Sequence, residues 1–93
     1  MNRNIKDDIS ELSILLKSIK NSEEIYKFLH EILTESELDT LSKRWRIINM
    51  LKEGFTQREI SSKLNVSLCK VTRGSKILKD NTSITKKYLI KEN

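Results

Sequence analysis

Apolar residues recur along the first fifty positions at steps of three and four, the spacing of amphipathic helices. The expected first helix carries the stripe Ile5, Ile9, Leu12, Leu16 and Ile19. After a break at Asn21-Ser22, a second stripe is formed by Ile25, Phe28, Leu29, Ile32 and Leu33. A third stripe runs from Leu38 to Leu51 and places Trp45 in the core, and Gly54 then supplies a helix stop.

The segment from Thr56 to Gly74, TQREISSKLNVSLCKVTRG, predicts two helices joined by a tight turn. Thr56 and Ser67 stand where N-caps are needed, and Asn65 tolerates the positive φ of the turn. Ile60 and Val71 are spaced to pack against each other. This pattern is typical of a helix-turn-helix that binds DNA, and the alternative is an ordinary helical hairpin.

Charge divides the chain unevenly. The net charge is +5, yet residues 41–93 hold thirteen Lys and Arg against four Asp and Glu, whereas residues 1–40 hold five against nine. The C-terminal half is therefore expected to face a polyanion. Charge alone leaves DNA, RNA and an acidic protein open as partners.

The exposed start of the second helix of the pair is expected to enter the major groove. Its base-reading candidates are Leu68, Cys69, Lys70 and Thr72. Gln57 and Arg58 are placed to meet phosphates or a groove edge, and the candidates for weaker backbone contacts are Lys63, Lys76 and Lys79. Cys69 is interpreted as a small contact residue rather than a redox sensor.

Several function classes lack support in the sequence. One cysteine, Cys69, and one histidine, His30, are too few for a zinc site, so no metal is expected. No nucleophile motif or glycine-rich phosphate loop is present, so the chain is predicted not to be an enzyme. No run approaches the roughly 18 apolar residues of a membrane span, and the first residues lack a secretory signal. We therefore expect a cytoplasmic protein without membrane contact.

Gly74 stands on the inward face, about three positions after Val71, where an apolar residue is usual. A glycine inside a helix costs about 1 kcal/mol relative to alanine. Two explanations are open at this point. Gly74 permits close packing with the third helix, or it leaves room for a flat small molecule beside the Arg73 guanidinium.

These residues resemble the tryptophan repressor family over roughly residues 25–90. The matching positions are QRE at 57–59, TRGS at 72–75 with Leu78-Lys79, and upstream Leu33-Thr34, Arg44, Arg46, Ile47-Ile48 and Gly54. The resemblance implies an all-α fold of about six short helices that forms an intertwined homodimer with a helix-turn-helix head. Within one folded domain, residues 1–55 would form the dimerisation region, 56–80 the DNA-binding head and 81–93 a C-terminal helix. The surplus of apolar stripes in the N-terminal half also favours a dimer.

The resemblance further implies a tryptophan-responsive repressor of tryptophan biosynthesis or uptake genes, with double-stranded operator DNA as partner and no covalent cofactor. L-Tryptophan, the non-covalent corepressor, would lie between Arg44 and Arg73 in the space that Gly74 leaves. Thr34 and Arg73 would hold its carboxylate, and main-chain carbonyls near Glu31 and Leu33 of the other subunit would hold its ammonium.

Two departures from the family pattern support an alternative. Ile77 stands where the well-known enterobacterial form has a serine that helps bind the amino group, and the connection before Gln57 is one residue shorter. The alternative is a regulator of the same fold that does not use tryptophan. Another alternative is a basic helical adaptor that binds RNA or an acidic protein.

Overall fold

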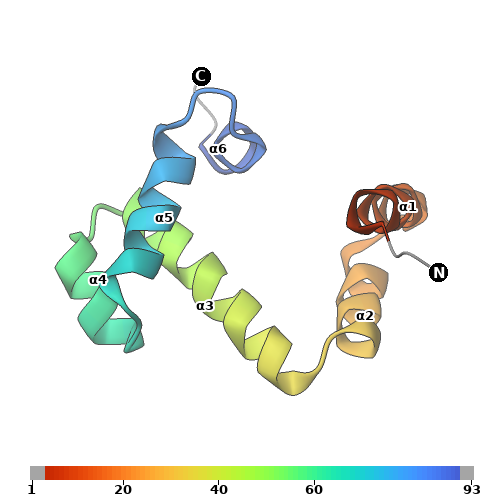
Figure 1. The fold of residues 1–93 in the computed structure, drawn as a ribbon, viewed down its shortest axis with the longest axis horizontal. Coiled ribbons are helices and arrows are strands. Elements are labelled where there is room, and N and C mark those ends of the chain that lie inside the picture. The colour runs from red at the N-terminus through yellow and green to blue at the C-terminus, as the bar shows by residue number, and fades with distance from the viewer. Residues whose placement is uncertain (1–3, 91–93) are drawn as a thin grey trace. The chain divides into compact units, whose positions relative to one another are not determined.

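The computed structural model describes residues 4–90, and within that range it contains six helices and no strand (Figure 1). The helices are α1 (Ile5–Ser18), α2 (Ser22–Ile32), α3 (Glu35–Lys52), α4 (Gln57–Leu64), α5 (Leu68–Lys79) and α6 (Ile84–Leu89). The all-α fold of about six helices is thereby confirmed. No helix in the described range is both long and apolar enough to cross a membrane. The chain divides into two compact units, residues 1–38 and 39–93.

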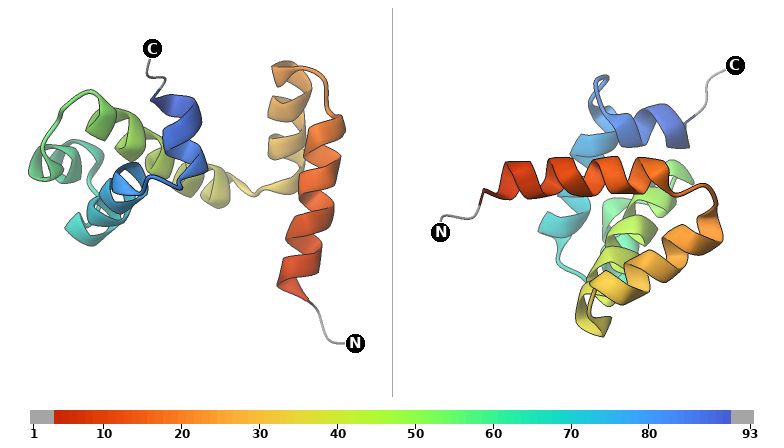
Figure 2. Two further views of the ribbon diagram at one scale, coloured as in Figure 1. Left: turned by 90° about the horizontal axis from the view of Figure 1, so that it is seen from above. Right: turned by 90° about the vertical axis from the view of Figure 1, so that its right-hand side faces the viewer.

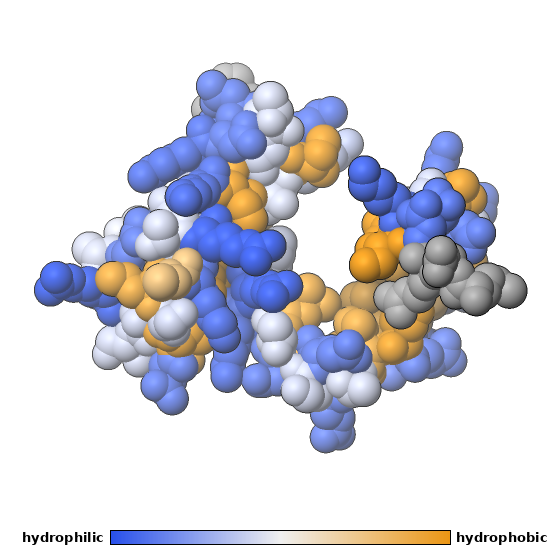
Figure 3. All heavy atoms as spheres, viewed as in Figure 1, coloured by the Kyte–Doolittle hydropathy of each residue, from blue (hydrophilic) through white to orange (hydrophobic). Residues whose placement is uncertain are grey.

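The described part of the N-terminal unit contains α1 and α2 but no buried core. Asn4 caps α1 by accepting the Lys6 and Asp7 N–H groups, and Asn21 caps α2 by accepting the Glu24 N–H. Neither helix buries a single described residue, and Ile5 and Ile9 are more than half exposed. Figure 3 shows apolar side chains gathered on the surface of this unit. The predicted stripes form and are only partly covered within the described unit: Leu12, Leu16 and Phe28 are half-buried, whereas Ile5 and Ile9 stay exposed.

The C-terminal unit has a small core of its own. Ile47 and Met50 from α3 meet Ile60 from α4 and Val71 from α5, and all four are buried. Figure 2 shows α4 and α5 lying side by side within this unit, in agreement with their contacts. α5 also contacts α6. The predicted packing of Ile60 with Val71 is confirmed, and α5 contacts both α4 and α6.

The turn between α4 and α5 is fixed by local hydrogen bonds. Asn65 adopts a left-handed conformation with φ of 53°, as its position predicts. The Ser61 hydroxyl donates to the Val66 carbonyl at 2.6 Å, and the Val66 N–H donates back to the Ser61 carbonyl at 3.1 Å. Ser67 then caps α5 by accepting the Lys70 N–H. The direction of α5 relative to α4 is therefore set within a few residues.

The start of α4 carries a reciprocal capping box. The Thr56 N–H donates to the Glu59 carboxylate at 3.0 Å, and the Thr56 hydroxyl accepts the Glu59 N–H at 3.1 Å. The hydrogen bond from the Thr56 backbone is the main reason that the pKa of Glu59 lies below its ordinary value. The predicted N-cap at Thr56 is confirmed.

The expectation that Trp45 lies in the core is wrong for the single chain. Trp45 is 53% exposed and Leu41, one turn earlier, is 43% exposed. The buried side of α3 is instead the one that carries Ile47 and Met50. A helical stripe shows which residues share a face, but it does not show which face a neighbouring helix covers.

We predict that Asn65→Val lowers the free energy of unfolding by about 1–2 kcal/mol, because a β-branched residue is strained at positive φ. Asn65→Gly is the matched control and should keep most of the stability, because glycine adopts this conformation freely. Chemical denaturation at one protein concentration measures both variants. Equal stability of the valine variant and the parent would contradict this account of the turn.

Candidate ligand groove and nucleic-acid interface

A groove lies between α3 and α5 in the C-terminal unit. Its volume is ≈ 390 Å³, within the range of about 300–1,000 Å³ that is usual for small-molecule sites. Its apolar lining comes from Ile47 and Ile48 of α3, Val66 of the turn, and Ile77 of α5. A space of this size and character suits a flat apolar group.

Gly74 is buried where α5 passes α3, and it also lines this groove. A Cβ at this position would lie 2.8 Å from the Ile47 Cγ2 and 3.4 Å from the Leu51 Cδ1. Ile47 has a rigid branched side chain and is 2% exposed, so it cannot easily move away. Close packing with the third helix therefore accounts for the glycine, and the same residue forms part of the groove.

The rim of the groove is mainly cationic. Arg44 and Lys43 come from α3, Arg73 and Lys70 come from α5, and the single carboxylate is Asp39. Asp39 already pairs with Lys43 at 3.2 Å. Neither arginine has an ion-pair partner among residues 4–90. The groove thus presents two unpaired guanidinium groups, which favour an anionic ligand.

Three of the predicted ligand residues line the groove, and the other two belong to the N-terminal unit. Arg44, Arg73 and Gly74 line the groove, as does Ile77. Leu33 and Thr34 belong to the N-terminal unit and are not part of the lining. Thr34 caps α3: its hydroxyl accepts the Glu37 N–H at 3.2 Å, while its own N–H donates to the Glu37 carboxylate at 2.9 Å. That backbone hydrogen bond is the main reason that the pKa of Glu37 is lowered.

The predicted DNA-contact residues fall into two groups. Arg58 at the start of α4 is exposed, as are Leu68, Cys69 and Lys70 at the start of α5. Gln57 and Thr72 are half-buried and joined to each other by a hydrogen bond of 2.9 Å. The first group is free to meet a partner, whereas the Thr72 donor is engaged inside the protein.

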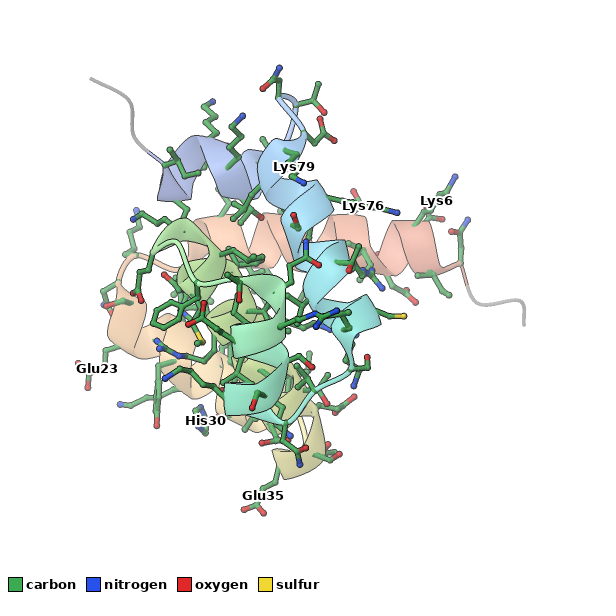
Figure 4. The ribbon with its side chains drawn as sticks, turned by 90° about the vertical axis from the view of Figure 1, so that its left-hand side faces the viewer. Lys6, Glu23, His30, Glu35, Lys76 and Lys79 are labelled. Atoms are coloured by element: carbon green, nitrogen blue, oxygen red, sulfur yellow. The ribbon has the colours of Figure 1, made fainter. Side chains whose placement is uncertain are left out.

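The three lysines predicted to make backbone contacts are also at the surface of this unit. Figure 4 shows Lys76 and Lys79 projecting from α5. The Lys63 ammonium lies over the Phe55 ring, 5.5 Å from its centroid, a cation–π contact. All three are exposed, so their charges are available to a polyanion.

Sequence reasoning missed Lys43, Ile48 and Val66 as groove residues and assigned Lys70 to DNA alone. The spacing carries a signal for three of them. Ile48 follows Arg44 by one helical turn, Lys70 precedes Arg73 and Gly74 by about one turn, and Lys43 precedes Ile47 by one turn. No group of His, Cys, Asp or Glu that could hold a metal ion occurs in the part of the chain that the structure describes.

The described chain is a small all-helical protein, and α4 and α5 are consistent with a helix-turn-helix. The chain belongs to the Trp repressor protein family, whose family model matches residues 7–93. This is a family of regulators rather than of enzymes.

Relatives agree with this assignment, and a solved structure has the same fold. The chain is 42% identical to a Trp operon repressor homolog of Xylella fastidiosa over 71 residues, covering 75% of this chain and 76% of the relative. A homolog of the same name from Chlamydia caviae is 39% identical over 66 residues, covering 70% and 65%. A crystal structure from Staphylococcus aureus, assigned to the Trp repressors, superposes with a TM-score of 0.69 at 24% identity, covering 99% of this chain and 100% of that one. That structure supports the fold.

We predict that Gly74→Ala destabilises the protein by about 1–3 kcal/mol, because the added methyl group overpacks against Ile47. Ile47→Ala is itself destabilising but removes the opposing methyl group, so the two changes together should cost less than their sum. Denaturation of both single variants and the double variant measures this coupling. Strictly additive losses would show that Gly74 does not determine the approach of α5 to α3.

Proposed function

We propose that this chain is a tryptophan-responsive, DNA-binding transcriptional repressor of tryptophan biosynthesis or uptake genes, acting as a homodimer. The observation that carries the proposal is the groove beneath Gly74, which has an apolar lining and unpaired guanidinium groups from Arg44 and Arg73. Guanidinium groups stack on aromatic rings and bind carboxylates, and L-tryptophan has both an aromatic ring and a carboxylate.

In this proposal, the partner subunit completes the ligand site. Thr34 would bind the tryptophan carboxylate together with Arg73. The Thr34 hydroxyl accepts the Glu37 N–H, so its own proton is left to donate to an anion. Main-chain carbonyls at Glu31 and Leu33 would accept hydrogen bonds from the ammonium group. Ligand binding would therefore be a property of the dimer.

The uncovered apolar surface supports the dimer. α1 and α2 bury no described residue, and Trp45 on α3 is 53% exposed. Burying one large apolar side chain contributes about 1.5–3 kcal/mol, so leaving a row of them in water is costly. A second copy of the chain offers the same stripes and can cover them through a two-fold interface.

DNA binding is assigned to α4 and the start of α5. Arg58 and Gln57 would meet phosphates, while Leu68, Cys69 and Lys70 would face base edges in the major groove. Tryptophan between α3 and α5 would favour one placement of the two heads of the dimer, because it binds that conformation more tightly than the others. Repression would follow from occupation of the operator.

One observation favours a second candidate function. Ile77 lines the groove with a side chain that has no hydrogen-bonding group. Where the resembled family uses a serine for the amino group of tryptophan, this chain offers only apolar surface. The second candidate is a DNA-binding regulator of the same fold that does not respond to tryptophan.

Isothermal titration of L-tryptophan into the purified protein tests the ligand. We expect saturable binding with about one ligand per chain, and Arg73→Ala should weaken it roughly tenfold or more because it removes a charged partner of the carboxylate. Arg58→Ala is the matched control: tryptophan affinity should stay within about twofold, while duplex affinity falls and its salt dependence decreases by about one unit of slope. Absence of heat at millimolar tryptophan would favour the second candidate.

Sedimentation equilibrium tests the dimer. We expect a mass of about twice 10.9 kDa for the parent chain, and a shift toward the monomer for Ile9→Glu, which places a charge on the exposed stripe. Ser10→Glu adds the same charge at an exposed position beside the stripe and should remain dimeric. A monomeric parent at micromolar concentration would contradict the proposal.

A further inference from the structure

Thr72 and Gln57 form a hydrogen bond that joins α5 to α4. The Thr72 hydroxyl donates to the Gln57 Oε1 at 2.9 Å, although the two residues are 15 positions apart. The same hydroxyl lies 3.0 Å from the Leu68 carbonyl oxygen in its own helix. A threonine has a single donor, and here that donor is occupied within the protein. Thr72 is therefore half-buried with its donor engaged, whereas Leu68 and Cys69 nearby are exposed.

This contact determines what the Gln57 side chain offers a partner. A glutamine amide has one acceptor oxygen and an NH2 group with two donors. The hydrogen bond from Thr72 fixes which way the amide faces, and the NH2 group makes no hydrogen bond to another residue in the described range. Donors of this kind suit phosphate oxygens. Gln57 is the first residue of α4 and lies next to the exposed Arg58.

We propose that Thr72 is a positioning residue for DNA binding, which holds the Gln57 amide with its NH2 group directed to a phosphate oxygen and does not itself read a base. This inference rests on the proposed function. Thr72 directly precedes Arg73 and Gly74, which line the groove. The same turn of α5 therefore lines the proposed ligand site and carries the hydrogen bond to Gln57. A ligand that moves α5 would move this phosphate-binding amide with it.

The test measures affinity for a duplex that the parent protein enriches from a random-sequence pool in the presence of L-tryptophan. Thr72→Val removes the hydroxyl with little change in shape and should weaken binding about fivefold to tenfold, the usual worth of one side-chain hydrogen bond. Thr72→Ser restores the hydroxyl and should bind within about twofold of the parent. Thr85→Val, the same replacement on α6, is the control and should leave affinity unchanged.

A double-mutant cycle separates positioning from direct contact. In the Gln57→Ala background, Thr72→Val should cause little further loss, because the group that it positions is already gone. The salt dependence of binding should not change, since neither residue is charged. Additive losses would overturn the inference by showing that Thr72 contacts DNA independently. A lower melting temperature with unchanged affinity would overturn it by showing a purely structural role.

The outcomes also separate this inference from the proposed function. If the parent protein enriches no duplex, the proposed function fails and the positioning role fails with it. If a duplex is enriched and Thr72→Val binds it as tightly as the parent does, only the inference is overturned.

Discussion

The close approach of α5 to α3 at Gly74 is the contact on which the groove and the placement of α5 both depend. A Cβ at Gly74 would lie 2.8 Å from the Ile47 Cγ2, and Ile47 itself belongs to the buried core. The glycine therefore allows α5 to lie against α3 with the groove beside the contact. The turn at Asn65 fixes α4 relative to α5, so the contact at Gly74 also determines where α4 lies relative to α3. A ligand bound in the groove would contact α5, the helix whose first turn carries Leu68 and Cys69.

The two compact units have different requirements for stability. The C-terminal unit buries four apolar side chains from three helices and has a core, although a small one. The described part of the N-terminal unit buries none, while it presents apolar stripes along α1 and α2. A second copy that covers these stripes would link folding to association, so the measured stability would depend on protein concentration. The proposed ligand site would also depend on the dimer, since main-chain carbonyls near Glu31 and Leu33 would come from the other subunit.

Features fixed by neighbouring residues could be predicted from the sequence, and features fixed by distant contacts could not. The caps at Thr56 and Ser67 and the positive φ at Asn65 depend on a few adjacent residues, so the pattern was sufficient. Trp45 was misplaced because a stripe does not show which helix covers it. The partner of the Thr72 hydroxyl lies 15 residues away, and no local rule indicates it. The sequence also left two explanations for Gly74, and the distance to Ile47 supports the packing explanation while the groove keeps room for a ligand.

The central claim is that one small molecule in the groove changes the affinity of the chain for DNA. The most direct measurement is duplex affinity as a function of L-tryptophan concentration, at fixed salt, with duplexes enriched both in the presence and in the absence of the ligand. The account predicts a rise of about tenfold or more that saturates with tryptophan, and an equal rise in tryptophan affinity when the duplex is present. The same affinity at every tryptophan concentration would contradict it, and the DNA-binding surface would then act without this ligand.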